Sequence, residues 1–202
     1  MLSMISSNID LESNLKPKSS TTMYPKIIKA DVSHAAVIAS IAKKTFRHTF
    51  SGIFHNSEDL FEYLEYSYNP VKLVRSLRKE NNVYLLAFSG NDPAGFVKVK
   101  THSLNDQIES GAQMQLQKIY VLPQYQSAGI GSALMKKAID LSWDVHPDYV
   151  WLDAPASNAQ ALKFYERHGF HRLGQYFLTI GSQSFEYYLM GLPVAAEMMN
   201  AC

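Results

Sequence analysis

The sequence predicts a single domain of the mixed α/β class. Strand patterns and helical stripes alternate along the chain in the order β-α-α-α-β-β-β-α-β-α-β-β. A chain of 202 residues is long enough to bury one sizeable core, and 47% hydrophobic with 18% charged residues is ordinary for a globular protein. The third observation is a strand, a small-residue loop and a helix over residues 116–145, around which the rest of the chain is organised.

The other elements follow from periodicity and from capping and turn residues. We expect a flexible lead-in over 1–23, the folded domain over 24–193 and a tail over 194–202. In order, the expected elements are a strand over 24–29, a helix from Asp31 or Ser33 to about 44, an aromatic loop or broken helix over 45–55, helices over 57–68 and 70–79, strands over 83–88, 95–101 and 114–122, a helix over 130–145, a strand over 149–153, a helix over 157–169 with Ser157 and Gln160 as its capping box, and a closing hairpin of 170–179 with 185–190.

The composition argues against several kinds of partner. A formal net charge of +1 gives no electrostatic basis for binding nucleic acid or a membrane surface. No apolar run approaches the ~18 residues that span a bilayer, and the first residues lack the basic region of a secretory signal. Cys202 is the only cysteine. We therefore expect a cytoplasmic protein with no internal disulfide and no cysteine nucleophile.

The stretch Leu116–Gly131, LQKIYVLPQYQSAGIG, predicts an anion site. Pro123 ends an apolar strand, and Gly129 and Gly131 then open a helix. This geometry gathers free backbone N–H groups at a helix N-terminus, where the partial positive charge favours a phosphate. A tight turn without a ligand is the alternative. The loop lacks the nucleotide-hydrolase motif, and the place of a third Rossmann glycine is taken by Leu134.

Two signatures resemble those of the GNAT superfamily, the Gcn5-related N-acetyltransferases. The first is Gln126-x-x-Gly129-x-Gly131 after a strand that ends in Val-Leu-Pro, and the second runs from Asn158 through Phe164-Tyr165 to Gly169-Phe170. The resemblance covers roughly residues 24–193. Within the family, the aromatic and acidic stretches over 45–50, 58–64 and 68–69 look like the bacterial PaiA-type spermidine/spermine acetyltransferases.

The resemblance implies a GNAT-like domain, with a mostly antiparallel central sheet, one parallel strand pair that splays apart, and flanking helices. Acetyl-CoA would lie between the splayed strands as co-substrate, with no metal. The pantetheine arm would pair with the strand edge as an added strand does, and the Val121 amide would polarise the thioester oxygen. The residues expected to bind it are Ile119, Tyr120, Val121, Gln126, Ser127, Ala128, Gly129, Ile130, Gly131, Ser132, Asn158 and Tyr165.

The expected reaction is direct attack of an amine on the thioester in a ternary complex. Tyr165, seven residues after Asn158 on one helix face, is the expected general acid for the leaving thiolate; packing beside Phe164 is the alternative role. The base is left open. Gln117 stands where related enzymes often carry Glu, and it cannot take a proton, although it can position a water. His48 is a second candidate, with a loop histidine of no catalytic role as its alternative.

The acceptor is expected to be a small primary amine, and a polyamine is the nearest class. Residues 45–68 and the hairpin near Gly181 are expected to form its pocket, including Glu62, Glu65, Tyr63, Tyr66 and Tyr68. These residues equally suit a surface helix with a buried aromatic stripe. A protein or peptide acetyltransferase and a catalytically silent acyl-CoA-binding regulator are the alternative functions, and the sequence leaves a homodimer open.

Overall fold

The computed structural model describes residues 25–194, which form seven strands and six α-helices with two short 3₁₀ turns. The expected lead-in over 1–23, most of the expected tail and Cys202 lie outside these residues. The strands are β1 (Lys26–Lys29), β2 (Asn82–Ser89), β3 (Asp92–Lys100), β4 (Gln113–Val121), β5 (Tyr149–Pro155), β6 (His171–Ile180) and β7 (Gln183–Pro193). The helices are α1 (Ala35–Phe50), α2 (Ser57–Ser67), α3 (Pro70–Leu77), α4 (Ile130–Asp140), α5 (Ser142–Val145) and α6 (Ala159–Arg167), and the 3₁₀ turns are η1 (Val32–His34) and η2 (Pro123–Tyr125).

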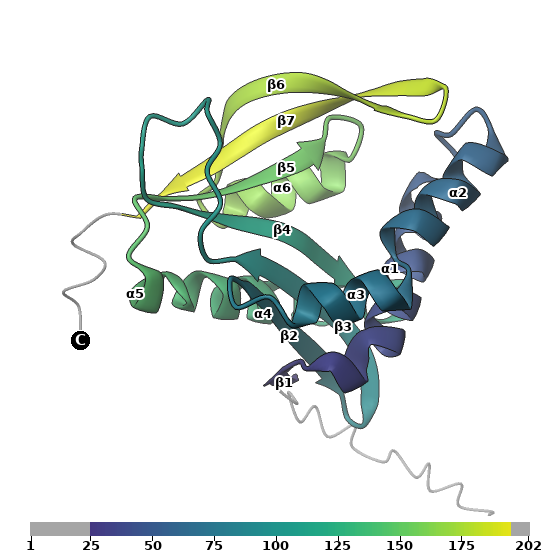
Figure 1. Ribbon diagram of the computed structural model, residues 1–202, viewed down its shortest axis with the longest axis horizontal. Coiled ribbons are helices and arrows are strands. Elements are labelled where there is room, and N and C mark those ends of the chain that lie inside the picture. Colours follow the sequence, from purple (N-terminus) through teal and green to yellow (C-terminus); the bar gives the residue numbers. More distant parts are fainter. Residues whose placement is uncertain (1–24, 195–202) are drawn as a thin grey trace, which may run out of the picture.

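All seven strands form one sheet in the order β1-β2-β3-β4-β5-β7-β6 (Figure 1). Neighbours are antiparallel except for β4 and β5, which are parallel and pair only from Gln113↔Tyr149 to Gln115↔Trp151. Beyond Gln115 the two strands separate, and their remaining residues have no strand between them. The predicted fold class, including the splayed parallel pair, is therefore confirmed.

Helices cover both faces of the sheet and bury two main cores. α1, α2 and α3 pack on one face around residues such as Ile38, Leu64 and Phe96. α4 and α6 pack on the other face, where Leu134 and Leu152 are buried. The β6–β7 hairpin extends beyond the end of its neighbour β5 and reaches over toward α2 (Figure 1). Within residues 25–194, no helix combines the length and the apolar character needed to cross a bilayer.

β4 contains a bulge at Gln117. Lys98 of β3 pairs with Lys118, but the next residue, Val99, pairs with Leu116, so Gln117 has no partner across the strands. A bulge inserts one extra residue and reverses which side chains face which side of the sheet. It lies where β4 leaves β5, at the start of the split.

The bulge decides what the end of β4 presents to each face. Leu116 before the bulge and Ile119 and Val121 after it all pack toward α4, although an unbroken alternation would not place them together. Lys118 and Tyr120 consequently point to the face that carries α1 and α2, where Tyr120 joins the first core. The bulge thus places a lysine and a tyrosine at the opening between the strands.

Three predicted details were wrong. The aromatic stretch over 45–55 was expected to be irregular, but α1 continues to Phe50, because Phe46 and Phe50 are buried against the sheet. The helix expected over 130–145 is interrupted at Leu141. Ser157 does not cap α6: the Asn158 side chain is the N-cap and accepts a hydrogen bond from the backbone N–H of Ala161 at 3.1 Å.

Candidate active site

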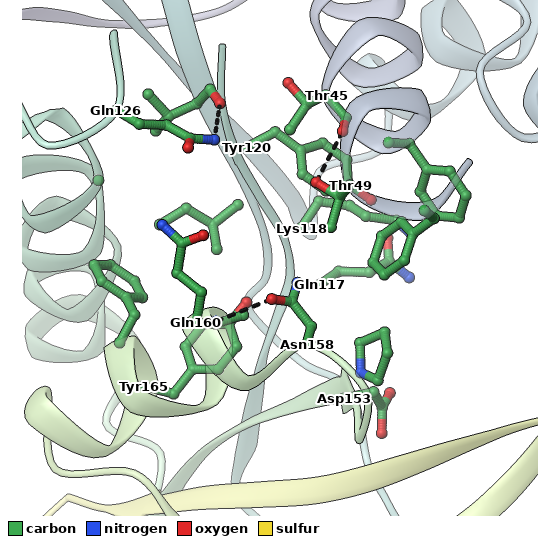
Figure 2. Close-up of a pocket in the computed structure, with 18 of the residues that line it drawn as sticks. Thr45, Thr49, Gln117, Lys118, Tyr120, Gln126, Asp153, Asn158, Gln160 and Tyr165 are labelled. Carbon is green, nitrogen blue, oxygen red and sulfur yellow. Dashed lines mark hydrogen bonds between the residues drawn. The ribbon is translucent and has the colours of Figure 1, made fainter. Parts of the chain in front are cut away.

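A cavity of about 460 Å³ occupies the split between β4 and β5. One end lies between the start of α4 and α6, and the other reaches α1, α2 and β7 (Figure 2). Three charged residues of the described chain line it: Lys118, Asp153 and Arg167. The cavity therefore has two ends of different chemistry, joined along the open edge of β4.

The loop before α4 forms a cradle of backbone N–H groups. Gly129 is the N-cap with φ +78°, and no side chain caps the helix. The backbone N–H of Ala133 bonds to the Gly129 carbonyl, so the N–H groups of residues 130–132 have no partner within the helix. A Cβ built on Gly131 would lie 3.5 Å from the Phe164 ring, an ordinary contact, so the fold itself does not require glycine there. The space beside Gly131 suits a ligand that approaches the backbone closely.

The open edge of β4 offers further backbone groups. The N–H of Leu122 donates to the Ala94 carbonyl at 2.8 Å, which sets the antiparallel pattern with β3. In that pattern alternate residues face away from β3, so Ile119 and Val121 turn their N–H and C=O groups into the split. The Val121 carbonyl accepts a hydrogen bond from Gln126 Nε2 at 3.3 Å. The Val121 N–H remains available to a ligand oxygen.

α6 supplies the other wall of this end. Asn158 and Tyr165 both line the cavity (Figure 2), as predicted from their spacing. The Tyr165 hydroxyl makes no hydrogen bond to another described residue, and its ring lies 5.6 Å from that of Phe164. Burial, with a smaller effect of Tyr120, raises the pKa of Tyr165 above its ordinary value. The phenol is therefore protonated at neutral pH and can donate a hydrogen bond or a proton.

The opposite end contains the only carboxylate among the described lining residues, Asp153 on β5. Its Oδ1 is buried and lacks a hydrogen-bond partner. Burial raises the pKa of Asp153, while the Tyr176 hydroxyl and the Lys118 charge partly oppose that shift. A carboxylate that lines a cavity and has a raised pKa can act as a general base. Tyr187, also in the cavity wall, lies on the neighbouring strand β7.

Contacts between the hairpin tip and the segment around the start of α2 join the two elements, α2 and β7, that line this end through Tyr63 and Tyr187. Asp59 accepts hydrogen bonds from Ser182, and Gln183 Nε2 donates to the Ile53 carbonyl at 2.8 Å. The rings of Phe54 and Phe185 pack 4.9 Å apart. We call these contacts the clasp. Residues 45–68 and the hairpin near Gly181 were predicted to form one pocket. The two segments are in contact, and Thr45, Phe46, Thr49, Phe50 and Tyr63 line the cavity, but the hairpin tip does not.

Most of the residues expected to bind the cofactor surround the first end of the cavity. Ala128 does not line the cavity, and the Ile130 side chain is buried in the core, so both would contribute through the backbone alone. The lining members of that set are Ile119, Tyr120, Val121, Gln126, Ser127, Gly129, Gly131, Ser132, Asn158 and Tyr165.

Several acceptor-side expectations are not supported. His48, Glu62 and Glu65 are exposed and do not line the cavity, and Glu65 pairs with Lys43 at 2.7 Å. Tyr66 is 72% exposed.

Tyr68 is buried, with its hydroxyl 2.8 Å from that of Tyr120. Tyr63 and Gln117 do line the cavity. Sequence reasoning missed Asp153 and Lys118, which were read as parts of ordinary strands. The signal that could have found them is a charged residue inside an otherwise apolar strand.

The fold and the site agree with a known family model. The model that describes the acetyltransferase (GNAT) family matches residues 41–170, which is more than half of the chain. The chain belongs to the acetyltransferase (GNAT) family. This acetyltransferase is accordingly an acyl-CoA-dependent N-acetyltransferase, with acetyl-CoA as its co-substrate.

Its relatives are similar over most of their length. An uncharacterised N-acetyltransferase of Lactobacillus delbrueckii subsp. lactis is 22% identical, covering 77% of this chain and 90% of its own. An uncharacterised N-acetyltransferase of Mycobacterium tuberculosis is 23% identical, covering 79% and 97%. The structure of PaiA N-acetyltransferase from Thermoplasma acidophilum in complex with coenzyme A has a TM-score of 0.68 at 20% identity, covering 85% of this chain and all of that one. The ribosomal-protein-S18-alanine N-acetyltransferase from Escherichia coli has a TM-score of 0.57 at 23% identity, covering 86% and 97%.

The cavity fits the co-substrate. The cradle at residues 130–132 and the space beside Gly131 suit a diphosphate, and the free edge at Ile119 and Val121 suits an amide-bearing arm. Arg167 lines the same end, where an anionic group of the co-substrate would be attracted. Among residues 25–194 there is no cluster of three or more side chains suited to a metal ion.

Proposed function

We propose that this acetyltransferase moves the acetyl group directly to a small primary amine that enters from the clasp end of the cavity. The observation that carries the proposal is the placement of Asp153 and Tyr165 in one cavity, on β5 and α6. A carboxylate with a raised pKa and a protonated phenol are the base and the acid that this reaction needs.

Acetyl-CoA supplies the thioester carbonyl that the amine attacks and the thiolate that leaves. In our proposal the Val121 N–H donates to the carbonyl oxygen, on which negative charge develops during attack. The amine arrives as an ammonium, with a pKa near ~10 by analogy with lysine, and its nitrogen has no lone pair for the attack until it gives up a proton. Asp153 holds the ammonium and accepts the proton.

Tyr165 acts last. Its hydroxyl has no competing partner among the described residues and lies on the wall opposite Lys118 and the α1 threonines in the view of Figure 2. It donates to the departing sulfur, which needs a proton or a hydrogen bond as negative charge builds up. Asn158, fixed by its own cap bond, is proposed to donate its side-chain amide to the pantetheine arm.

A small acceptor is favoured over a peptide. The clasp holds α2 and the β6–β7 tip together beside the acceptor end, which leaves less room for a peptide than two separate elements would. The polyamine class has only indirect support, through the fold that is shared with the PaiA enzyme. A cytoplasmic location and a homodimer stay predictions.

A thiol-release assay tests the proposed function. Acetyl-CoA is offered with a panel of polyamines, amino acids, aminoglycosides and peptides, and the acetylated product is identified by mass spectrometry. We expect amine-dependent release that Asp153→Asn largely abolishes. If the protein binds acetyl-CoA but releases no thiol with any amine, the silent-regulator alternative replaces the proposal.

A further inference from the structure

The acceptor end of the cavity contains a lysine that the mechanism above does not use. Lys118 follows the bulge on β4 and is half-buried in the cavity wall (Figure 2). No carboxylate of the described residues lies within 4.0 Å of its ammonium group. Its Nζ lies 5.8 Å from the centre of the Tyr68 ring, a weak cation–π contact. Taking a lysine ammonium out of water costs stability. Burial works against the charge of Lys118, but the neighbouring tyrosines, Tyr120 first, keep the pKa of Lys118 above its ordinary value, so the lysine is charged without a carboxylate partner among the described residues.

The neighbouring charges increase this cost. Lys98 lies directly across from Lys118 in the β3–β4 register, and like charges in that position destabilise a sheet. Burial, together with the charges of Lys100, Lys118 and Lys79, lowers the pKa of Lys98 to about 8. Lys72 joins Lys98 and Lys118 around a smaller side cavity of about 150 Å³, which shares a wall with the main one. Three lysines thus line the side cavity, Lys118 also lines the acceptor end, and none of the three forms an ion pair with a carboxylate of the described residues.

Among the described residues that line this end, only Asp153 carries a negative charge. It does not form an ion pair with Lys118, since their charged atoms are more than 4.0 Å apart. The two are close enough for the Lys118 charge to lower the pKa of Asp153. The carboxylates that a polycation would need, Glu62 and Glu65, are exposed outside the cavity. The acceptor end therefore presents one carboxylate and one ammonium with a gap between them.

We infer that the acceptor is an amine that also carries an anionic group, and that Lys118 selects it by binding that group. The inference rests on the proposed function and names its substrate class. Asp153 holds the ammonium that is acetylated, and Lys118 holds a carboxylate or a phosphate at the other end of the molecule. Lysine binds either group as a point charge, and such a charge-assisted bond is stronger than a neutral one.

The reaction does not change at Lys118. Asp153 takes one proton from the ammonium, the neutral nitrogen forms its bond to the acetyl carbon, and the carbon–sulfur bond breaks as Tyr165 protonates the sulfur. The nitrogen then loses a second proton, which restores the Tyr165 hydroxyl. Lys118 touches the acceptor at a distance from the reacting atoms. It therefore affects which amine is used, and it repels a second ammonium on a polyamine.

The test compares amines of equal chain length that differ only at the far end. In one such set 4-aminobutyrate carries a carboxylate, butylamine a methyl group and 1,4-diaminobutane an ammonium, and further sets vary the chain length. 2-Aminoethyl phosphate is included as an amine that carries a phosphate in place of a carboxylate. We expect the wild-type kcat/KM to be highest for an anionic member of a set. Lys118→Gln should lower that preference by between about ten- and a hundredfold, and Lys118→Glu should shift it toward the diamine.

The preference is a ratio measured within each variant, so partial misfolding cancels. Lys100→Gln is the matched control, because Lys100 is a half-buried lysine at the end of β3 that lines neither cavity. Its preference should equal that of the wild type. A wild-type enzyme that prefers the diamine or the alkylamine would overturn the inference and leave the proposed function standing. So would an equal loss of preference in Lys100→Gln.

A second readout needs no turnover. Thermal unfolding of the CoA-loaded protein is measured with butyrate or with butylamine at equal concentration and ionic strength. We expect butyrate to raise the Tm of the wild type more than that of Lys118→Gln. If no amine is acetylated, the proposed function fails, and this measurement still decides the anion site. Equal shifts in the two proteins would overturn it.

Discussion

The carboxylate of Asp59 accepts two hydrogen bonds from Ser182, one from its backbone N–H at 2.8 Å and one from its hydroxyl at 2.6 Å. These contacts join the first turn of α2 to the tip of the β6–β7 hairpin, across 123 positions of sequence. They also hold the pKa of Asp59 below its ordinary value. Gly181 makes the approach possible, because a Cβ there would collide with the carboxylate and its φ is +58°.

Asp59→Ala should open the clasp and loosen the acceptor pocket. We expect the KM for the amine to rise roughly severalfold while acetyl-CoA affinity changes little, since the cradle lies at the other end of the cavity. Gly181→Ala should also raise the KM for the amine, because the added Cβ would collide with the Asp59 carboxylate and push the hairpin tip away. Initial rates and calorimetry check both. Asp106→Ala removes an exposed aspartate elsewhere, and a comparable KM increase in that control would contradict a specific role for the clasp.

Gly131→Val should abolish acetyl-CoA binding without unfolding the protein. The first added carbon meets Phe164 at an ordinary 3.5 Å, so the fold tolerates it, whereas a bound diphosphate would occupy the same space. Calorimetry measures the affinity and circular dichroism the fold. Gly111→Val is the control, because a Cβ at Gly111 meets nothing within 4 Å. Unchanged affinity in Gly131→Val would mean that the loop is only a turn.

Tyr165→Phe removes the hydroxyl and keeps the ring that packs beside Phe164. General-acid assistance is typically worth about 10²–10⁴-fold, and a thiolate is a good leaving group, so we expect kcat to fall by around a hundredfold. Acetyl-CoA affinity should change little, because the lost interaction matters mainly in the transition state. A sharp drop in Tm with nearly normal kcat per folded molecule would instead make Tyr165 a core residue.

Asp153→Asn should lower kcat and raise the Tm at neutral pH. The folded-state pKa of Asp153 lies above its unfolded value because burial disfavours the charged form. Because the folded-state pKa is the higher of the two, the free energy of unfolding falls as the pH rises from the unfolded-state pKa to the folded-state pKa. Above the folded-state pKa the charged Asp153 therefore destabilises the fold. Asparagine removes this penalty together with the base. A lower Tm at neutral pH, or an unchanged kcat, would argue against the assignment.

The protonation of Asp153 also makes the enzyme activity depend on pH. Activity should rise as pH increases through the folded-state pKa of Asp153, because only the carboxylate accepts a proton. This is the window in which the carboxylate costs stability, so activity and stability should change in opposite directions. Activity and Tm measured over one pH series test this, and a parallel rise of both would contradict it.

Local patterns predicted much of this fold. Gly129 and Gly131 predicted the loop. Periodicity predicted a strand before Pro123 and a helix after the loop, and the structure has both. The spacing of Asn158 and Tyr165 correctly put both on one wall of a cavity. These features depend on neighbours within a few residues, which the sequence displays directly.

Features that depend on distant packing were harder to predict. α1 continues through Thr45 to Phe50 because aromatic rings there bury against the sheet, and burial overrides weak helix propensity. The bulge at Gln117 leaves no mark in the sequence, yet it turns Lys118 toward the acceptor end. The sequence places Asp153 in an ordinary strand. Its role as a candidate base depends on the split between β4 and β5, which makes it part of a cavity wall.

Initial rates at varied concentrations of both acetyl-CoA and an accepted amine test the central claim of direct transfer most directly. Within residues 25–194 the chain has no cysteine to carry the acetyl group, and Asp153 and Tyr165 share the cavity in which both substrates would meet. We expect intersecting lines in the double-reciprocal plot, the pattern of a ternary complex. Parallel lines, or an acetylated enzyme trapped with acetyl-CoA alone and detected by mass spectrometry, would contradict direct transfer.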